Sequence, residues 1–155
     1  MEIRRARKKD LNGVANLLRQ VLDVHHKGRP DIFYGGVKKY TDEETLAIFE
    51  NEKTPVFVAV EDGAVLGYAF CIHQQITNSH ILTDIRTLYI DDLCVDETVR
   101  GKGVGKKLYE YVVDYAKKEG FYNLTLNVWS CNENALRFYE KMGLVPQKIG
   151  MEKIL

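Results

Sequence analysis

The chain has 155 residues, of which 22 are basic and 22 are acidic, so its formal net charge at pH 7 is zero. A length of this order is typical of one compact domain, and we expect a single domain over residues 1–155. Because the charges balance, the protein lacks the overall positive field that would attract nucleic acids or anionic membranes. Neither is therefore predicted as a partner.

Compartment and redox state follow from what the sequence lacks. No apolar run approaches the roughly 18 residues of a membrane-spanning helix, and the N-terminal residues 1–5 lack the apolar core of a signal peptide. A cytoplasmic location is therefore expected by default. Cys71, Cys94 and Cys131 form no C-x-x-C pair, which predicts free thiols rather than disulfides or a zinc site, and no bound metal is expected.

The first elements expected are a short strand and two helices. Residues 3–5 favour a strand, and Asp10 is expected to cap a helix whose apolar side chains recur at helical spacing. Those side chains are Leu11, Val14, Leu17, Leu18, Val21 and Leu22. Thr41 and Glu44 have the spacing of a capping box, which predicts the start of a second helix.

A hairpin and two strand–helix pairs are expected next. Strands over residues 56–61 and 64–73 flank Asp62-Gly63, a dipeptide typical of a type I′ turn, and should pair antiparallel. The remaining elements expected are strands over 87–95 and 122–128, helices over 104–119 and 133–142, and one or two final strands within 144–155. This alternation favours an α/β or α+β layer fold.

The turn from Arg100 to Gly105 reads Arg-Gly-Lys-Gly-Val-Gly and joins an expected strand to an expected helix. Small residues let the backbone approach a phosphate closely, and the unpaired N–H groups of the helix's first turn point at it. The turn therefore predicts a pyrophosphate ligand. A Walker A loop does not fit, because Arg100 and Lys107 stand where it needs Gly and Ser or Thr. The dinucleotide fingerprint fails because Lys106 stands where its third Gly belongs.

A second motif follows the next strand, where residues 132–144 read Asn-Glu-Asn-Ala-Leu-Arg-Phe-Tyr-Glu-Lys-Met-Gly-Leu. The two motifs, Arg-Gly-x-Gly-x-Gly and then Asn-x-x-Ala-x-x-Phe-Tyr-Glu-Lys-x-Gly, together resemble the GCN5-related N-acetyltransferase (GNAT) superfamily over roughly residues 56–155. The resemblance implies a single-domain α/β fold with a mixed, strongly twisted, mostly antiparallel sheet and helices on both faces. Its two central strands would splay apart and hold acetyl-CoA in the wedge between them.

The resemblance also implies which residues hold acetyl-CoA. The pyrophosphate would lie on the backbone N–H groups of residues 101–106, with Arg100 adding charge, although its side chain is equally compatible with solvated surface. Backbone groups of residues 93–95 would pair with the pantetheine arm, and one N–H would polarise the thioester carbonyl. Asn132 would bind the pantetheine or cap the helix beside it. The full set is Leu93, Cys94, Val95, Arg100, Gly101, Lys102, Gly103, Val104, Gly105, Lys106, Asn132 and Tyr139.

Three residues are candidates for proton transfer. Tyr139 matches the family tyrosine that donates a proton to the leaving thiolate, and a phenol of pKa about 10 is protonated at neutral pH. Packing of its ring on the core is the alternative. Asp91 and Asp92 interrupt an apolar strand, where charge is costly unless it is used, and either could accept the proton of the amine. Strand alternation should send them to opposite faces, so only one would face the thioester.

Substrate recognition is expected in the long connection over residues 24–40, which contains His25 and Tyr34, with His73 on the opposite wall. The function predicted is acetyl transfer from acetyl-CoA to the primary amine of a small molecule, by direct attack in a ternary complex. The acidic pair favours a small cationic amine. A peptide or protein N-terminal or lysine acetyltransferase and a non-catalytic acyl-CoA-binding regulatory module are the alternatives. The sequence leaves a homodimer open.

Overall fold

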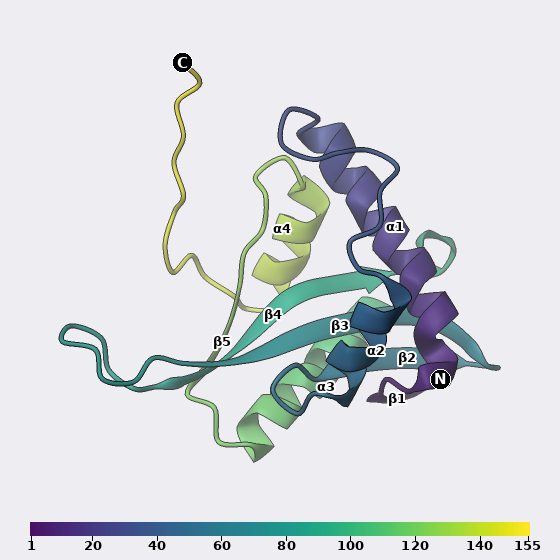
Figure 1. The fold of residues 1–155 in the computed structure, drawn as a ribbon, viewed down its shortest axis with the longest axis horizontal. Helices are drawn as coiled ribbons and strands as arrows, with labels where there is room; N and C mark the ends of the chain where they lie inside the picture. Colours follow the sequence, from purple (N-terminus) through teal and green to yellow (C-terminus); the bar gives the residue numbers. More distant parts are fainter.

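A five-stranded sheet forms the centre of the computed structural model, which describes residues 1–155 (Figure 1). The strands are β1 (Glu2–Arg5), β2 (Val56–Glu61), β3 (Ala64–Gln75), β4 (Arg86–Val95) and β5 (Asn123–Leu126). They lie in that order across the sheet, the first four antiparallel and β5 parallel to β4. The predicted mixed, mostly antiparallel sheet is confirmed.

Helices cover both faces of this sheet, as predicted. They are α1 (Leu11–Gly28), α2 (Asp42–Glu50), α3 (Val104–Lys118) and α4 (Glu133–Lys141), with single 3-10 turns at Lys8–Asp10 and Glu97–Val99. α1 and α2 pack on one face, where Leu17 and Phe49 meet Val58. α3 packs on the other, where Leu108 meets Ile90. None of these helices has an apolar stretch long enough to span a membrane.

Local sequence signals set two of the boundaries. Asp62 and Gly63 have φ values of 49° and 79°, the two positive angles that the predicted type I′ turn requires. At the start of α2, the hydroxyl of Thr41 accepts from the N–H of Glu44, and the N–H of Thr41 donates to the Glu44 carboxylate. The predicted hairpin and capping box are both confirmed.

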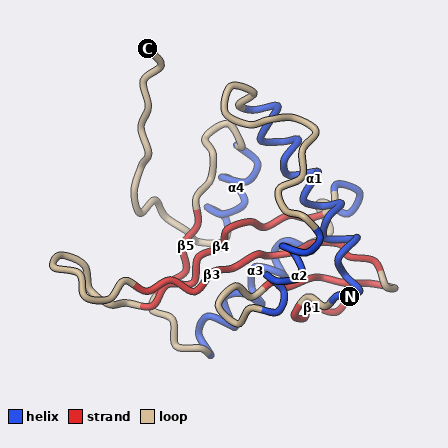
Figure 2. Tube along the Cα trace, in the orientation of Figure 1, coloured by secondary structure: helices blue, strands red, loops and turns tan.

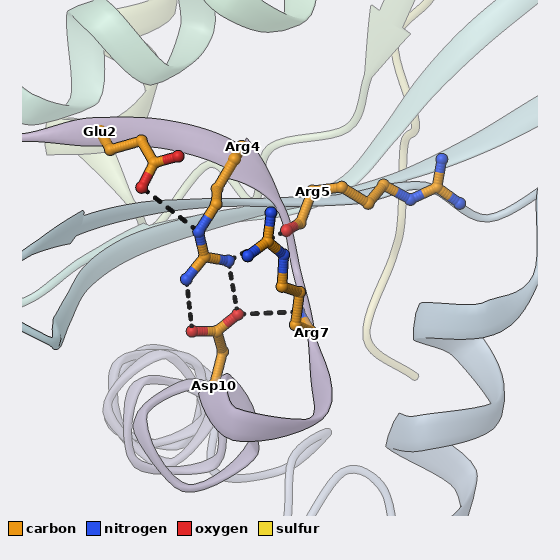
Figure 3. A network of polar contacts seen from close by, with 5 residues as sticks. All are labelled: Glu2, Arg4, Arg5, Arg7 and Asp10. Atoms are coloured by element: carbon orange, nitrogen blue, oxygen red, sulfur yellow. Dashed lines mark hydrogen bonds and ion pairs between the residues drawn. The ribbon is translucent and has the colours of Figure 1, made fainter.

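Asp10 precedes α1 but does not cap it through its side chain, contrary to the prediction. Its carboxylate instead accepts two hydrogen bonds from the Arg4 guanidinium, of 2.7 and 3.0 Å, and one of 2.7 Å from the N–H of Arg7 (Figure 3). Burial acts to raise the pKa of Asp10, but the hydrogen bonds from Arg4 and Arg7 outweigh it and lower that pKa. This buried ion pair joins Arg4 of β1 to Asp10, the residue that precedes α1.

Residues 144–155 form no strand, so the predicted final strands are wrong for the single chain. The segment leaves the end of α4 and runs outward as a loop, which can be followed to the C-terminus in Figure 2. The physical reason is that a strand exists only by pairing, and no backbone hydrogen bond joins residues 145–155 to the rest of the chain.

Candidate active site

The candidate site lies where β4 and β5 separate. The two strands pair from Thr87 opposite Asn123 to Ile90 opposite Leu126. Beyond that point β4 continues to Val95, whereas β5 has ended. The edge of residues 91–95 that faces away from β3 is thus left without a strand partner. This is the splay predicted from the sequence, and it exposes backbone groups that an extended ligand could pair with.

A β-bulge in β4 sets the direction of the acidic side chains. Asp92 opposes Phe70 of β3 and Ile90 opposes Cys71, so Asp91 is an extra residue with no partner of its own. A residue inserted in this way interrupts the alternation of the strand. As a result, even-numbered residues after the bulge face the opposite side of the sheet from even-numbered residues before it. The same holds for odd-numbered residues.

Both carboxylates consequently lie beside Lys39, a residue of the loop between α1 and α2. The ammonium of Lys39 is 3.1 Å from Oδ2 of Asp91. Burial acts to lower the pKa of Lys39, but the charges of Asp92 and Asp91 outweigh burial and raise it. The predicted placement of the two aspartates on opposite faces is wrong, because alternation holds only in a strand without a bulge.

Asp92 has the more perturbed environment of the two. Its Oδ2 accepts a hydrogen bond of 2.7 Å from the hydroxyl of Tyr68, a fully buried residue of β3. Burial raises the pKa of Asp92 to about 6, against the opposing effects of the Tyr68 hydrogen bond and the Lys39 charge. A carboxyl of this kind is largely ionised at neutral pH and remains basic enough to accept a proton.

Tyr139 lies on α4, half-buried, with its ring centroid 5.2 Å from that of Phe138. Burial raises the pKa of Tyr139 above its ordinary value, and the nearby charge of Asp92 raises it further. The phenol is therefore fully protonated at neutral pH, the state that a proton donor requires.

The glycine-rich turn is open on its outer side. Gly101 and Gly103 have φ values of 81° and 80°, and a side chain built at either would meet no atom within 4 Å. Gly103 is the N-cap of α3, so the first N–H groups of that helix have no intrahelical acceptor. Arg100 donates from Nε to the carbonyl of Val95 at 3.3 Å, which ties the turn to the end of β4. This arrangement fits a pyrophosphate group.

The other residues predicted to hold the cofactor surround this turn. A side chain at Gly105 would lie 3.4 Å from Val95 and 3.5 Å from Phe138, so the start of α3 packs closely on β4 and α4. Asn132 accepts a hydrogen bond of 3.3 Å from the N–H of Ala135, and so caps α4. The ammonium of Lys106 is 3.8 Å from Glu110 on the exposed face of α3, and Lys102 is exposed.

His25 lies on α1, because that helix runs to Gly28 and the predicted connection begins at Arg29 rather than at residue 24. Its ring stacks on Phe33 at 5.0 Å, and Phe33 meets Trp129 edge-on at 5.1 Å. Burial lowers the pKa of His25, and the charge of Lys39 lowers it further. His25 is therefore close enough to Lys39 to sense its charge.

Tyr34 and His73 are not brought to the acidic pair. The side chain of Tyr34 is 85% exposed in the loop after α1. His73 lies on the α3 side of the sheet, where its Nε2 is 2.9 Å from the hydroxyl of Tyr115 and its ring packs edge-on to Phe121. No group of three or more His, Cys, Asp and Glu side chains is placed to hold a metal ion.

Two residues of the site were not found from the sequence. Lys39 lies within the connection predicted to recognise substrate, but nothing in its neighbours indicates an acidic partner. Tyr68 lies in a continuous run of apolar residues in its strand, so its hydroxyl gave no separate signal.

A family model described as the acetyltransferase (GNAT) family matches residues 21–144. Glucosamine 6-phosphate N-acetyltransferase of Arabidopsis thaliana is 28% identical over 76% of this chain and 69% of its own length. A peptidyl-lysine N-acetyltransferase of Salmonella typhimurium is 30% identical over 92% of this chain and 82% of its own. The chain spans about half the length of two other curated relatives.

Among solved structures, the crystal structure of a mutant of the BH1408 protein from Bacillus halodurans is 34% identical to this chain. It superposes with a TM-score of 0.96 over 100% of this chain and 99% of that one. The matched length therefore includes the C-terminal residues 145–155.

Proposed function

The chain belongs to the acetyltransferase (GNAT) family, and we propose that it transfers the acetyl group of acetyl-CoA to the primary amine of a small molecule, by direct attack in a ternary complex. The observation that carries this proposal is the position of Lys39. Its ammonium lies 3.1 Å from Asp91 and within the field of Asp92. A protonated primary amine presents the same alkylammonium group, so these two carboxylates are suited to bind one.

Asp92 is the proton acceptor in this proposal, and Asp91 holds the ammonium. An amine of pKa about 10 arrives mostly protonated and must lose a proton before it can attack. Asp92 combines a pKa raised to about 6 with a fixed orientation, because Tyr68 holds one of its oxygens. Asp91 makes its direct contact with the ammonium of Lys39 and lies on the bulge itself.

The glycine-rich turn would hold the pyrophosphate of acetyl-CoA through the first N–H groups of α3, and the unpaired edge of residues 93–95 would hold the pantetheine arm. When bound, acetyl-CoA supplies the thioester carbonyl that the amine attacks. One N–H of this edge would stabilise negative charge on the carbonyl oxygen. Tyr139 would donate its proton to the departing thiolate, and its raised pKa keeps the phenol protonated until that step.

The acceptor class is tested by the release of free thiol from acetyl-CoA with three sets of acceptors: small primary amines, peptides with free N-termini, and lysine-containing peptides. Small amines should give the highest kcat/KM. Two relatives are named for a sugar phosphate amine and for peptidyl lysine, so both classes belong in the panel. Faster turnover of peptides would assign the chain to peptide or protein acetylation. CoA binding without thiol release from any acceptor would indicate the regulatory module.

A further inference from the structure

Lys39 is held by its own chain beside the acidic pair, Asp91 and Asp92. It lies near the end of the loop that returns from α1 to α2, just before Thr41, whose capping box fixes the start of α2 (Figure 1). Its ammonium is 3.1 Å from Asp91, and the charge of Asp92 also acts on it. A primary amine of the chain thus lies where two carboxylates meet.

Packing on a second side orients this amine. The ammonium of Lys39 lies 5.4 Å from the centroid of the Tyr40 ring, and that ring stacks on Phe70 at 6.1 Å. Phe70 is a buried core residue of β3. The ion pair with Asp91 and the cation–π contact with Tyr40 offset the rotamer entropy lost on fixing a lysine side chain. The side chain remains 31% exposed, so it is oriented without being sealed from a ligand.

We propose that Lys39 is an acetylation site of this chain, and that the chain acetylates it in cis, on Nζ, from its own bound acetyl-CoA. The proposal rests on the function proposed above, because it places Lys39 where the acceptor amine would lie. An amine that belongs to the chain needs no separate binding step, so its effective concentration at the acidic pair is high. Lys39 should therefore react even when no external acceptor is present.

The step balances in atoms and charge. The ammonium of Lys39 gives one proton to Asp92, which passes it to water, and the free amine then attacks the acetyl carbon. A bond forms between Nζ and that carbon, while the bond from the carbon to sulfur breaks. Tyr139 gives a proton to the departing sulfur and recovers one from the nitrogen. The products are N-acetyl-lysine at position 39, the free thiol of CoA and one proton.

Incubation of the full chain with acetyl-CoA and no acceptor, followed by site-resolved mass spectrometry, tests the proposal. Lys39 should gain an acetyl group with a first-order rate constant that is independent of protein concentration. Lys38, its exposed neighbour, reports the uncatalysed background and should react at least about 10-fold more slowly. Asp92→Asn should slow the reaction of Lys39 by about 100-fold or more and leave Lys38 unchanged. Equal rates at the two lysines, or a rate constant that rises with protein concentration, would overturn the proposal.

Labelling with acetic anhydride tests the same geometry without turnover. CoA that carries no acetyl group should protect Lys39 several-fold from the reagent, because its thiol would lie beside the ammonium, and should leave Lys38 unprotected. Asp92→Asn should retain this protection, which would show that the variant is folded and binds CoA. Equal labelling of Lys39 with and without CoA would overturn the proposal, because the thioester would then be out of its reach.

External amines separate this proposal from the proposed function. Without acceptor, the wild type should release one equivalent of thiol per chain, and Lys39→Arg should release much less, because a guanidinium keeps the charge but is not deprotonated. Thiol release driven by small amines, with Lys39 unmodified, would overturn this proposal and leave the proposed function in place. Acetylation of Lys39 without turnover of any amine would support this proposal and overturn the small-molecule function. An unmodified Lys39 with no thiol release from any amine would overturn both.

Discussion

The hydroxyl of Tyr68 donates a hydrogen bond of 2.7 Å to Oδ2 of Asp92, and so joins a fully buried phenol of β3 to a carboxylate of β4. Burial raises the pKa of Tyr68 well above its ordinary value, so the phenol remains protonated and a donor at neutral pH. The bond favours the ionised form of Asp92, while burial of the carboxylate favours the protonated form. The balance of these two effects should govern how the rate depends on pH.

Asp92→Asn should remove the rise of kcat/KM with pH. In the wild type the rate should rise through a pH of about 6, because the carboxylate can accept a proton only when it is ionised. The variant should lose this limb and fall in kcat/KM by about 100-fold or more. Asp91→Asn is the matched control, and it should raise the KM of the amine while keeping the limb. A limb that disappears only in Asp91→Asn would reverse the two roles.

Tyr68→Phe should move the same limb to higher pH. Removing the hydrogen bond withdraws a donor that stabilises the ionised carboxylate, so the pKa of Asp92 should rise above about 6. The plateau rate at high pH should change little, because the base itself remains. The measurement is the full pH profile of kcat/KM for wild type and variant. A uniform loss of rate with no displacement of the limb would mean that Tyr68 acts through packing alone.

Tyr139→Phe should lower kcat by about 10- to 1000-fold with little effect on the affinity for acetyl-CoA, because it removes a proton donor and keeps the packing with Phe138. Single-turnover kinetics, in which chemistry limits the rate, is the suitable measurement. Tyr109→Phe, whose ring lies 6.5 Å from that of Phe138, is the control. If both variants keep the wild-type rate, the phenol of Tyr139 has only a packing role.

Gly103→Val should weaken CoA binding, since it places a branched side chain in the open space beside the first turn of α3. The positive φ of 80° adds backbone strain of about 1 to 2 kcal/mol. Gly63→Val has the same strain, at a φ of 79° in the β2–β3 turn, and isolates the effect on binding. CoA should raise the Tm of Gly63→Val as it does that of the wild type, and much less that of Gly103→Val. Equal shifts would place the pyrophosphate elsewhere.

Arg4→Met should destabilise the fold by about 3 to 5 kcal/mol at pH 7, because it leaves the buried carboxylate of Asp10 without its partner. The folded-state pKa of Asp10 is lowered, so the stabilisation is present above its ordinary pKa of about 3.9 and is lost as the pH falls. Wild type and variant should therefore converge in stability in acid. Urea unfolding at pH 7 and in acid measures the free energy of unfolding of both proteins. Arg19→Met, at an exposed arginine of α1, is the control.

Features set by a few adjacent residues could be predicted from the sequence, and features set by pairing across the chain could not. The Asp62-Gly63 turn and the Thr41–Glu44 capping box each depend on residues at most three positions apart. The bulge at Asp91 depends on register with β3, about 20 residues away, and no local pattern indicates it. The sequence of the segment 145–155 predicts a strand, but a strand also requires backbone pairing, and no backbone hydrogen bond joins this segment to the sheet.

The extra residue at Asp91 also sorts the side chains of β4 between two cores. Before it, Leu88 and Ile90 enter the layer beneath α3, and after it Cys94 enters the layer beneath α1. In a strand of the same sequence without this bulge, regular alternation would carry the carboxylate of Asp92 into the apolar layer with Ile90. There it would have no phenol or ammonium beside it. The bulge therefore decides whether the carboxylate of Asp92 faces Tyr68 and Lys39 or is buried among apolar side chains without a partner.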